Sequence, residues 1–461
     1  MKVVVIGGGF AGFAAATALQ ERRHEVVLLE RRGILGGRAT SSRDAVTGDD
    51  VDNGTHVMVG AYSATLDLLR RSGAAELVQV QDELKLEWVD ERGTSALDCP
   101  PLAAPLHLLA GLAGLRVPLA VKLQGIRLGL AVRFGRRPEG LTLAEYFDRT
   151  GQGDAARRLL WDPLALAILN EPVERAAAVL FHRVYQEAFL RDHRASRLVF
   201  PRRGWSVLVE RVAAYFEGRG GRLRRGARAS SLLVTDGRVE GVRYQKRPEA
   251  RDAIAAGEPA AWQVESADAV VSAVPPPALL ELLAEREAPA FAALKHFSGS
   301  PIVSVDLWLD RVVVDRVMLG LRDAEMEWVF DKGRLHGREG APQHLAFIVS
   351  AAYRSAPKTN AELVDAAVSA LRRYFPAMAA AAVTRSLVQR EAQATFASTP
   401  ALEALRPGPV TALRGLFLAG DWTDTGLPAT IEGAVRSGLR AADAVEAASR
   451  GQTADLLSIV S

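Results

Sequence analysis

The sequence contains a single cysteine and none of three familiar catalytic patterns. Only Cys99 carries a thiol among the 461 residues, which excludes an internal disulfide framework and a zinc site built from several cysteines. No HExxH, GxSxG or P-loop pattern occurs, so we expect no metal centre and no chemistry of those three classes. A lone thiol fits a reducing compartment. Strand-like residues begin at Lys2 without an apolar leader, so we expect no signal peptide and a cytoplasmic location.

The positive and negative charges nearly balance. The formal net charge is only +3, and the arginines are spread along the chain without interleaved aromatic residues, which argues against a nucleic-acid partner. Residues 100–137 contain no acidic residue, and six basic residues interrupt their apolar runs. These runs are shorter than the roughly 20 apolar residues that span a bilayer. We expect the segment to line an apolar pocket, to lie on the inner face of the membrane with its cations near anionic headgroups, or to do both.

The first residues form a nucleotide-binding pattern. A short apolar strand precedes "GGGFAG", which opens an apolar helix. In a dinucleotide fold Gly7 makes the tight turn, Gly9 admits the pyrophosphate, and Gly12 lets helix and strand pack closely. The next strand, "EVVLLE", ends in Glu30, 18 residues after Gly12, near the spacing of an acid that binds a ribose. The pattern predicts a site for an adenine dinucleotide.

The stretch "GILGGRATS" follows this acid and contains Gly37 and Arg38. It resembles the second motif of the amine oxidase and phytoene desaturase flavoprotein superfamily. That resemblance implies that the cofactor is FAD, that Gly37 brings the backbone close to it, and that Arg38 lies near its pyrophosphate.

A second cofactor motif lies about four hundred residues later. The apolar run "GLFLAGDWT" predicts a buried strand that ends at Gly420 and Asp421, and a helix begins near Glu432, Gly433 and Ala434. The amino end of a helix carries positive partial charge, which suits the anionic edge of a reduced flavin. The resemblance implies that Asp421 accepts hydrogen bonds from the ribityl hydroxyls. We therefore expect the two motifs to hold opposite ends of one FAD.

The chain between the motifs predicts the domain organisation. A hairpin around Asp236 and Gly237, followed by the strand "ADAVVSAVPP", is similar to the superfamily's return to the cofactor domain, where Ala229 would touch the adenine. We expect an α/β fold with a discontinuous Rossmann-type FAD-binding domain and an inserted α+β substrate domain. The expected division is 1–65, 195–275 and 405–448 for FAD, 66–194 and 276–404 for substrate, and 451–461 as a loose tail. In the substrate domain, "PIVSVDLWL" and "HLAFIVSAAY" predict strands and residues 360–374 predict a helix.

A narrower resemblance rests on "DNGTHVMVGAY", which is similar to the "DNGQHVLLGAY" of the hydroxysqualene dehydroxylases of hopanoid biosynthesis. The strings "WDPLALAILNEP", "FPRRGWSVL", "WVFDKG" and "AGDWTDTGLPATIEGAVRSG" support it, and it covers nearly the whole chain. It implies that Gly54, Thr55 and His56 lie at the cofactor, with Thr55 in place of the family's Gln. It also implies that hydroxysqualene loses its allylic hydroxyl and gains a hydride from reduced FAD, which an unidentified reductant must supply with electrons.

Hydroxide is a poor leaving group, so this reaction needs a general acid. His56 is the first candidate because imidazole titrates near neutrality, although it could instead only position the backbone or the flavin. Tyr62 and Asp424 are further candidates.

Three other functions stay open. A carotenoid-type desaturase would use the same fold and move the hydride from substrate to FAD. An amine oxidase is less favoured, because its site usually needs an aromatic cage for the substrate and only 6% of the residues are aromatic. A non-catalytic flavin-binding scaffold for other terpenoid enzymes is the third.

Overall fold

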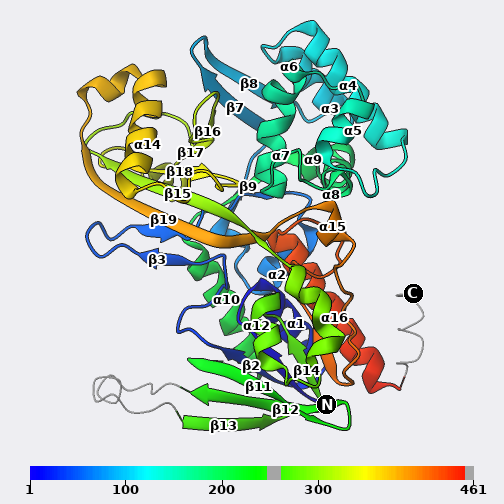
Figure 1. Ribbon diagram of the computed structural model, residues 1–461. Coiled ribbons are helices and arrows are strands. Elements are labelled where there is room, and N and C mark those ends of the chain that lie inside the picture. Colours follow the sequence, from blue (N-terminus) through cyan, green and yellow to red (C-terminus); the bar gives the residue numbers. More distant parts are fainter. Residues whose placement is uncertain (247–260, 452–461) are drawn as a thin grey trace.

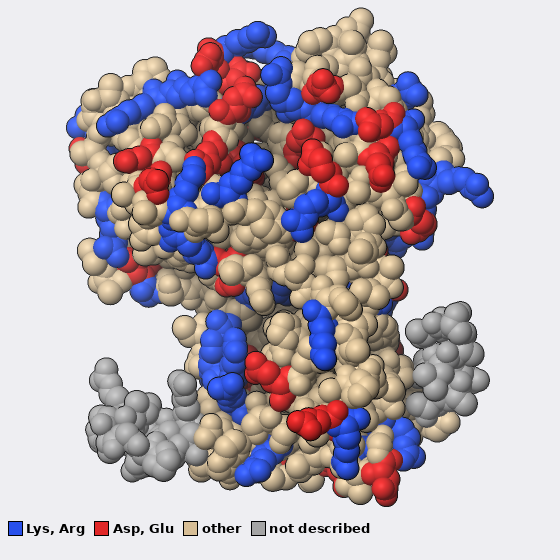
Figure 2. Space-filling view, in the orientation of Figure 1, with Lys and Arg blue, Asp and Glu red and all other residues tan. Residues whose placement is uncertain are grey.

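The computed structural model describes residues 1–246 and 261–451, which form two lobes that meet at a narrower waist (Figures 1 and 2). The lower lobe in Figure 1 contains both chain segments that carry the predicted cofactor motifs. Apart from Gly451, the predicted loose tail lies outside the described residues.

The lower lobe is built on a parallel sheet of five strands, all of whose neighbouring pairs run in the same direction. In spatial order these strands are β10 (Arg222–Arg225), β2 (Glu25–Glu30), β1 (Lys2–Ile6), β14 (Ala269–Ser272) and β20 (Leu416–Leu418). They come from widely separated parts of the chain. The predicted Rossmann-type α/β fold is therefore confirmed; the exact domain boundaries stay a proposal.

Alternate residues of β1 pack against different layers, because successive side chains of a strand point to opposite faces. Val3 and Val5 belong to a buried cluster with the helices on one face, whereas Val4 and Ile6 pack with a small antiparallel sheet on the other. The helices are α1 (Phe10–Glu21), α2 (Ser63–Arg71), α10 (Trp205–Gly218) and α16 (Ile431–Ser449). The small sheet contains β11 (Ala227–Thr235), β12 (Arg238–Lys246) and β13 (Ala261–Ser266), beside α12 (Pro276–Leu282) and the 3-10 helix η4 (Ala288–His296).

The predicted hairpin joins β11 and β12. Its turn residues Asp236 and Gly237 both have positive φ, 47° and 69°, as a two-residue hairpin of this kind requires.

The upper lobe is built on a seven-stranded, mostly antiparallel sheet. In spatial order it contains β19 (Val383–Phe396), β15 (Gly299–Leu309), β18 (Gln343–Val349), β17 (Trp328–Asp331), β16 (Met318–Leu321), β7 (Leu84–Asp90) and β8 (Gly93–Cys99). Helix α14 (Asn360–Tyr374) packs on one face. Both predicted strands and the predicted helix over 360–374 are confirmed, and with them the α+β character of this region.

A set of helices packs on the other face of the seven-stranded sheet around one apolar cluster. These are α3 (Leu106–Gly114), α4 (Leu119–Phe134), α5 (Leu143–Arg149), α6 (Asp154–Ala156), the π-helix η2 (Arg157–Trp161), α7 (Asp162–Leu169), α8 (Ala178–Val184), the π-helix η3 (Tyr185–Leu190) and α9 (His193–Ser196). The basic apolar segment thus becomes α3 and α4. Within residues 1–246 and 261–451, no helix combines the length and the apolar character that a membrane crossing would need.

Short elements connect the lobes. Strands β3 (Ser41–Arg43) and β4 (Asp50–Asp52) form a ribbon, and β5 (Met58–Val59), β9 (Leu198–Pro201) and β6 (Val78–Val80) form a small sheet. The remaining described elements are η1 (Ala75–Leu77), α13 (Lys332–Leu335), η5 (Pro376–Ala380) and α15 (Pro400–Glu403).

Candidate cofactor and substrate site

The glycine turn between β1 and α1 has two kinds of glycine. A Cβ on Gly7, whose φ is +111°, would lie 2.9 Å from the carbonyl oxygen of Ala273, and a Cβ on Gly12 would lie 1.8 Å from that of Gly7. A Cβ on Gly9 would meet nothing closer than 3.7 Å. Gly7 and Gly12 are therefore required by packing, while Gly9 leaves free space at the amino end of α1. This arrangement fits the three predicted roles.

The second glycine motif lies directly on this turn. The Gly36 amide donates to the Gly8 carbonyl at 2.8 Å, and a Cβ on Gly37 (φ +65°) would lie 3.4 Å from the Cα of Gly9. The glycine backbone of the first turn and that of the second motif therefore lie against each other where the pyrophosphate is expected.

Glu30 ends β2 beside the turn. Its buried carboxylate accepts hydrogen bonds from the amides of Gly8 and Arg32, both at 2.8 Å. The amide of Gly226 donates to the Arg32 carbonyl at 3.3 Å, which brings the start of β11 beside the end of β2. Ala229 follows in β11, opposite Tyr244. The predicted ribose and adenine residues thus share one side of the lobe.

The two distant cofactor motifs meet. Arg38 and Asp421 form an ion pair at 2.5 Å, and Arg38 also donates to the Ala394 carbonyl at 3.2 Å. Helices α1 and α16 pack backbone to backbone, because a Cβ on Gly438 would lie 2.2 Å from the carbonyl oxygen of Ala11. Asp421 is buried, so its carboxylate is held at the junction of the two motifs.

Arg406 holds the loop that carries Asp421. Its buried guanidinium donates to the carbonyls of Asp421 at 3.0 Å and Thr423 at 3.1 Å. Sequence reasoning missed this residue, because nothing in "LRPGP" distinguishes it from a surface arginine. Gly420, with φ +138°, donates its amide to the Ser437 hydroxyl in α16 at 2.7 Å.

The start of α16 differs from the prediction by about one residue. Thr430 caps the helix, and its hydroxyl accepts from the Gly433 amide at 3.0 Å while its carbonyl accepts from the Ala434 amide at 2.9 Å. Two of the predicted amides are therefore engaged inside the first turn. Among the described residues, the amides of Ile431 and Glu432 are the ones left for an anionic group, because first-turn amides have no partner within the helix.

The Glu432 carboxylate serves a different purpose. It is buried and accepts from the Thr65 amide at 2.9 Å, the Thr65 hydroxyl at 2.7 Å and the Ala64 amide at 3.1 Å. It therefore binds the amino end of α2, and Arg436 pairs with it at 2.8 Å. Its side chain joins α2 to α16.

His56 lies in the loop after β4 and is half-buried. Its Nδ1 is 2.7 Å from the Gly54 carbonyl oxygen, which requires a proton on Nδ1, and its ring meets Trp205 edge-on at 5.7 Å. Burial lowers its pKa, and the charge of Asp52 only partly offsets this. A lowered pKa favours the neutral imidazole, in which Nε2 is the acceptor. This geometry disfavours proton donation near neutrality, and the predicted acid role of His56 stays a prediction.

The neighbouring candidates differ in burial. Thr55 is half-buried, and Gly54 is buried with φ +138°. Tyr62 precedes α2; burial, and then the charge of Glu432, raise the pKa of its phenol, which stays protonated. Asp424 is exposed and accepts from the Gly426 amide at 3.2 Å, which favours a turn-forming role over proton donation.

A buried ion pair links this loop to the upper lobe. Lys332, the first residue of α13, pairs with Asp52, and both side chains are almost fully buried. The Ser41 hydroxyl donates to the other carboxylate oxygen of Asp52 at 2.5 Å. Sequence reasoning singled out both "DNGTH" and "WVFDKG", but nothing in either string indicates that they touch.

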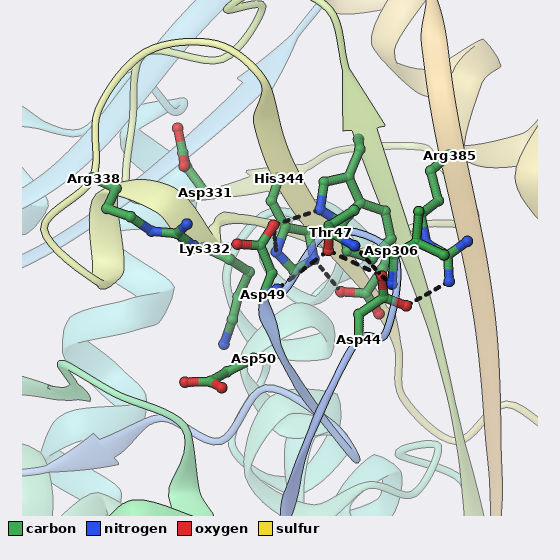
Figure 3. A network of polar contacts seen from close by, with 12 residues as sticks. Asp44, Thr47, Asp49, Asp50, Asp306, Asp331, Lys332, Arg338, His344 and Arg385 are labelled. Carbon is green, nitrogen blue, oxygen red and sulfur yellow. Dashed lines mark hydrogen bonds and ion pairs between the residues drawn. The ribbon is translucent and has the colours of Figure 1, made fainter.

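A wider polar network anchors the β3–β4 ribbon on the seven-stranded sheet (Figure 3). Asp49 accepts from the Trp308 indole at 2.7 Å and from Arg338 at 2.5 Å. His344 stacks on Trp308 at 4.2 Å and bonds to Asp306 at 2.7 Å. The loop that carries His56 is thus attached to both lobes.

These features define the class of the protein. A parallel sheet, a glycine turn at the amino end of α1, an acid at the end of β2 and a second backbone cradle at α16 are the features of a Rossmann-type dinucleotide-binding oxidoreductase. The free space at Gly9 and the free amides of α16 fit the two ends of FAD.

Comparison with known proteins gives the family. Residues 10–446 match the model of the flavin containing amine oxidoreductase family. The chain is 32% identical to a hydroxysqualene dehydroxylase of Rhodopseudomonas palustris over 97% of this chain and 99% of that protein. It is 25% identical to a zeta-carotene desaturase of Arabidopsis thaliana, over 96% and 84%. An oxidoreductase from Methanosarcina mazei has the same fold, with a TM-score of 0.72, 18% identity, and 95% and 99% coverage.

The chain belongs to the flavin containing amine oxidoreductase family and, within it, groups with the hydroxysqualene dehydroxylases. It is therefore an FAD-dependent oxidoreductase.

Proposed function

We propose that this protein reductively dehydroxylates hydroxysqualene to squalene. The observation that carries the proposal is the 32% identity to a hydroxysqualene dehydroxylase along nearly the whole of both chains. In this reaction the allylic C–O bond of the substrate breaks and the hydroxyl leaves with a proton as water. A C–H bond then forms at an allylic carbon of the substrate. FAD, when bound and reduced, supplies the hydride.

The cofactor would be held by two groups of residues. Gly9, Gly37 and Arg38 would hold its pyrophosphate beside Glu30 and Ala229 at the adenosine end. Asp421 and the first amides of α16 would hold the ribityl chain and the flavin. The ion pair of Arg38 with Asp421 supports a single continuous cradle.

His56 would contribute through a proton taken up on Nε2. Because its Nδ1 donates to Gly54 and burial lowers its pKa, the imidazole accepts a proton mainly at acidic pH. Asp52 would stabilise the imidazolium once it forms. A neutral imidazole would instead only orient the substrate hydroxyl, and the pH profile discriminates between these roles.

The thirty-carbon substrate would bind against the apolar region that helices α3–α8 form with the sheet face carrying Trp88, Trp328 and Phe330. These side chains pack together as a buried core, so it is the apolar character of this region that supports the proposal. An apolar environment excludes water from the carbocation that loss of hydroxide creates.

The outer surface of α4 supports a membrane source for this substrate. Five large apolar side chains recur on its outward side at helical spacing: Leu119, Leu123, Ile126, Leu130 and Phe134. Leu119 is 70% exposed and Phe134 is 76% exposed. Basic residues of the same helix, Lys122, Arg127 and Arg133, lie between them in the sequence. Apolar side chains beside cations fit the interface of an anionic membrane.

The decisive experiment is anaerobic. Purified FAD-loaded protein is chemically reduced and mixed with hydroxysqualene in detergent, while flavin absorbance and extracted lipid are followed together. Squalene formed in step with flavin reoxidation is the expected result. Reduced protein that leaves the alcohol unchanged would overturn the proposal.

A carotenoid-type desaturase is the second candidate, favoured by the 25% identity to a zeta-carotene desaturase over 96% of the chain. The same apparatus tests it with oxidised protein and a polyene precursor. Bleaching of the flavin by the polyene, with no reaction of the alcohol, would establish this direction instead.

A further inference from the structure

A cavity of about 540 Å³ lies between α2, the small sheet that contains β9, and the chain around α9. In Figure 1 α9 and β9 lie at the underside of the upper lobe, and α2 lies at the top of the lower lobe. The lining of this cavity combines two kinds of residue. The uncharged part is Gly60, Leu66, Val80, Ala195 and Val199, and the polar part is Arg191, Asp192, His193, Arg194 and Arg197.

The charges of this lining do not balance. Asp192 is the one acidic residue, and it is already engaged: it accepts from the Ala195 amide at 2.8 Å and pairs with Arg191 at 3.2 Å. Within the described part of the chain, the guanidinium groups of Arg194 and Arg197 have no hydrogen bond or ion pair, and Nε of Arg197 is shielded from solvent without a partner. A shielded polar group without a partner is costly.

We propose that this cavity binds a phosphate-bearing ligand. Two free guanidinium groups with His193 beside them provide the planar, multiple donors that phosphate oxygens prefer. The volume lies in the range of small-ligand sites, and Leu66, Val80 and Val199 offer an apolar wall to the rest of the molecule. The ligand class is thus a phosphate attached to an apolar or aromatic body.

Two sources share this chemistry. A soluble phosphorylated dinucleotide could be the missing reductant of FAD, and an anionic lipid headgroup could belong to the membrane that supplies the substrate. The cavity is close to the proposed flavin end, since Gly60 follows His56 by four residues and α2 begins at the carboxylate of Glu432. The anion site itself does not depend on the proposed reaction.

The test measures binding, so it is independent of turnover. Pyrophosphate is titrated into FAD-loaded protein by calorimetry, with the cofactor site filled to prevent binding there. Arg194→Gln and Arg197→Gln should each weaken binding about tenfold or more, since each removes a charge-assisted contact. Arg372→Gln is the matched control, because Arg372 is an exposed arginine of α14 on the opposite face of the upper sheet; it should change nothing.

Arg194 is exposed, so Arg194→Gln should fold even if the half-buried Arg197 proves necessary for stability. No binding at millimolar pyrophosphate, or binding that Arg194→Gln leaves intact, overturns the proposal. Competition separates the sources: displacement of pyrophosphate by NADPH identifies a dinucleotide, and displacement by phosphatidylglycerol vesicles but not phosphatidylcholine vesicles identifies a lipid headgroup. If neither competes, the proposed class of a phosphate on an apolar or aromatic body is wrong, and the cavity binds only the free anion.

Discussion

Helices α1 and α4 are both apolar, yet the protein uses them in opposite ways. Ten of the 12 residues of α1 are buried, but only four of the 16 residues of α4 are. Helix α1 is enclosed by the parallel sheet, α10 and α16, whereas Leu119, Leu123 and Leu130 of α4 face outward and only Leu128 among its leucines is buried. An apolar pattern predicts that a helix must be covered. It does not say whether the cover belongs to the same chain.

The packing of the buried helix α1 is tested with two glycines: Gly12, which lies in the helix, and Gly9, which lies in the turn before it. Gly12→Ala should destabilise the protein by at least about 3 kcal/mol and abolish FAD binding, because its Cβ would collide with the Gly7 carbonyl. Gly9→Ala should leave the melting temperature of the apoprotein unchanged and still lose FAD, since its Cβ has room in the protein but occupies the expected pyrophosphate position. Thermal denaturation and flavin absorbance measure the two effects.

If Gly9→Ala retained FAD with unchanged affinity, the turn would not be the pyrophosphate site. If Gly12→Ala were as stable as the parent protein, the close packing of α1 on β1 would be wrong.

The link between the lobes is the next test. Lys332→Met or Asp52→Asn should each cost about 3–5 kcal/mol in the free energy of unfolding, because each leaves one charge or polar group buried without its partner. Urea denaturation measures the cost. The double variant should recover part of the loss, and purely additive losses would contradict a direct pair.

This link also has a pH dependence. Burial by itself would raise the pKa of Asp52, but nearby positive charge, mainly that of Lys332, and the hydrogen bonds that Asp52 accepts together lower it further than burial raises it. The folded-state pKa of Asp52 therefore lies below its ordinary value. The carboxylate therefore contributes stability at neutral pH, and that contribution is lost as the pH falls through the folded pKa. Asp52→Asn should flatten the acid side of the stability profile.

The loop that carries His56 gives the third test. If His56 donates the proton, His56→Gln with FAD retained should lower kcat/KM about 100-fold at acidic pH. The pKa of His56 is lowered from 6.5, so activity of the parent protein should fall as pH rises through a value below 6.5, and the variant should lose this limb. A variant with full turnover and an unchanged profile would assign His56 to positioning alone.

The smallest expected effect concerns the exposed side of the comparison. Leu123→Ser and Leu130→Ser should each weaken binding to anionic vesicles by up to about tenfold, without a measurable change in stability because both side chains already face solvent. Val46→Ser is the matched control, since Val46 is 73% exposed on the β3–β4 ribbon. If all three variants co-sedimented with anionic vesicles to the same extent as the parent protein, the proposed membrane contact of α4 would be wrong.

Local patterns predicted the lower lobe well. The strand, glycine turn and helix at the amino end, the acid Glu30 and the hairpin at Asp236 follow from spacing and backbone conformation over a few residues. The start of α16 was less accurate, because Ile431, Glu432 and Gly433 could each begin a helix and only the hydrogen bond from Gly433 to Thr430 selects one.

The upper lobe and the site depended more on tertiary structure. The sequence indicated that α3 and α4 are apolar, but not which of their leucines turn outward. It could not show that Arg406 supports the loop of Asp421, or that Glu432 binds α2 with its side chain. Each of these contacts joins residues that no local rule connects.

The amino-acid sequence by itself determined the strand, glycine turn and helix at the amino end and the strand and helix of the second motif, because glycines, strand ends and helix starts are set by short-range sterics and hydrogen bonding. Only the tertiary structure decided that Asp52 meets Lys332, that Nδ1 of His56 lies at the Gly54 carbonyl, and that Arg194 and Arg197 line one cavity. The physical reason is that charge pairing, burial and pKa depend on neighbours in space, and those neighbours are brought together by the packing of the whole chain.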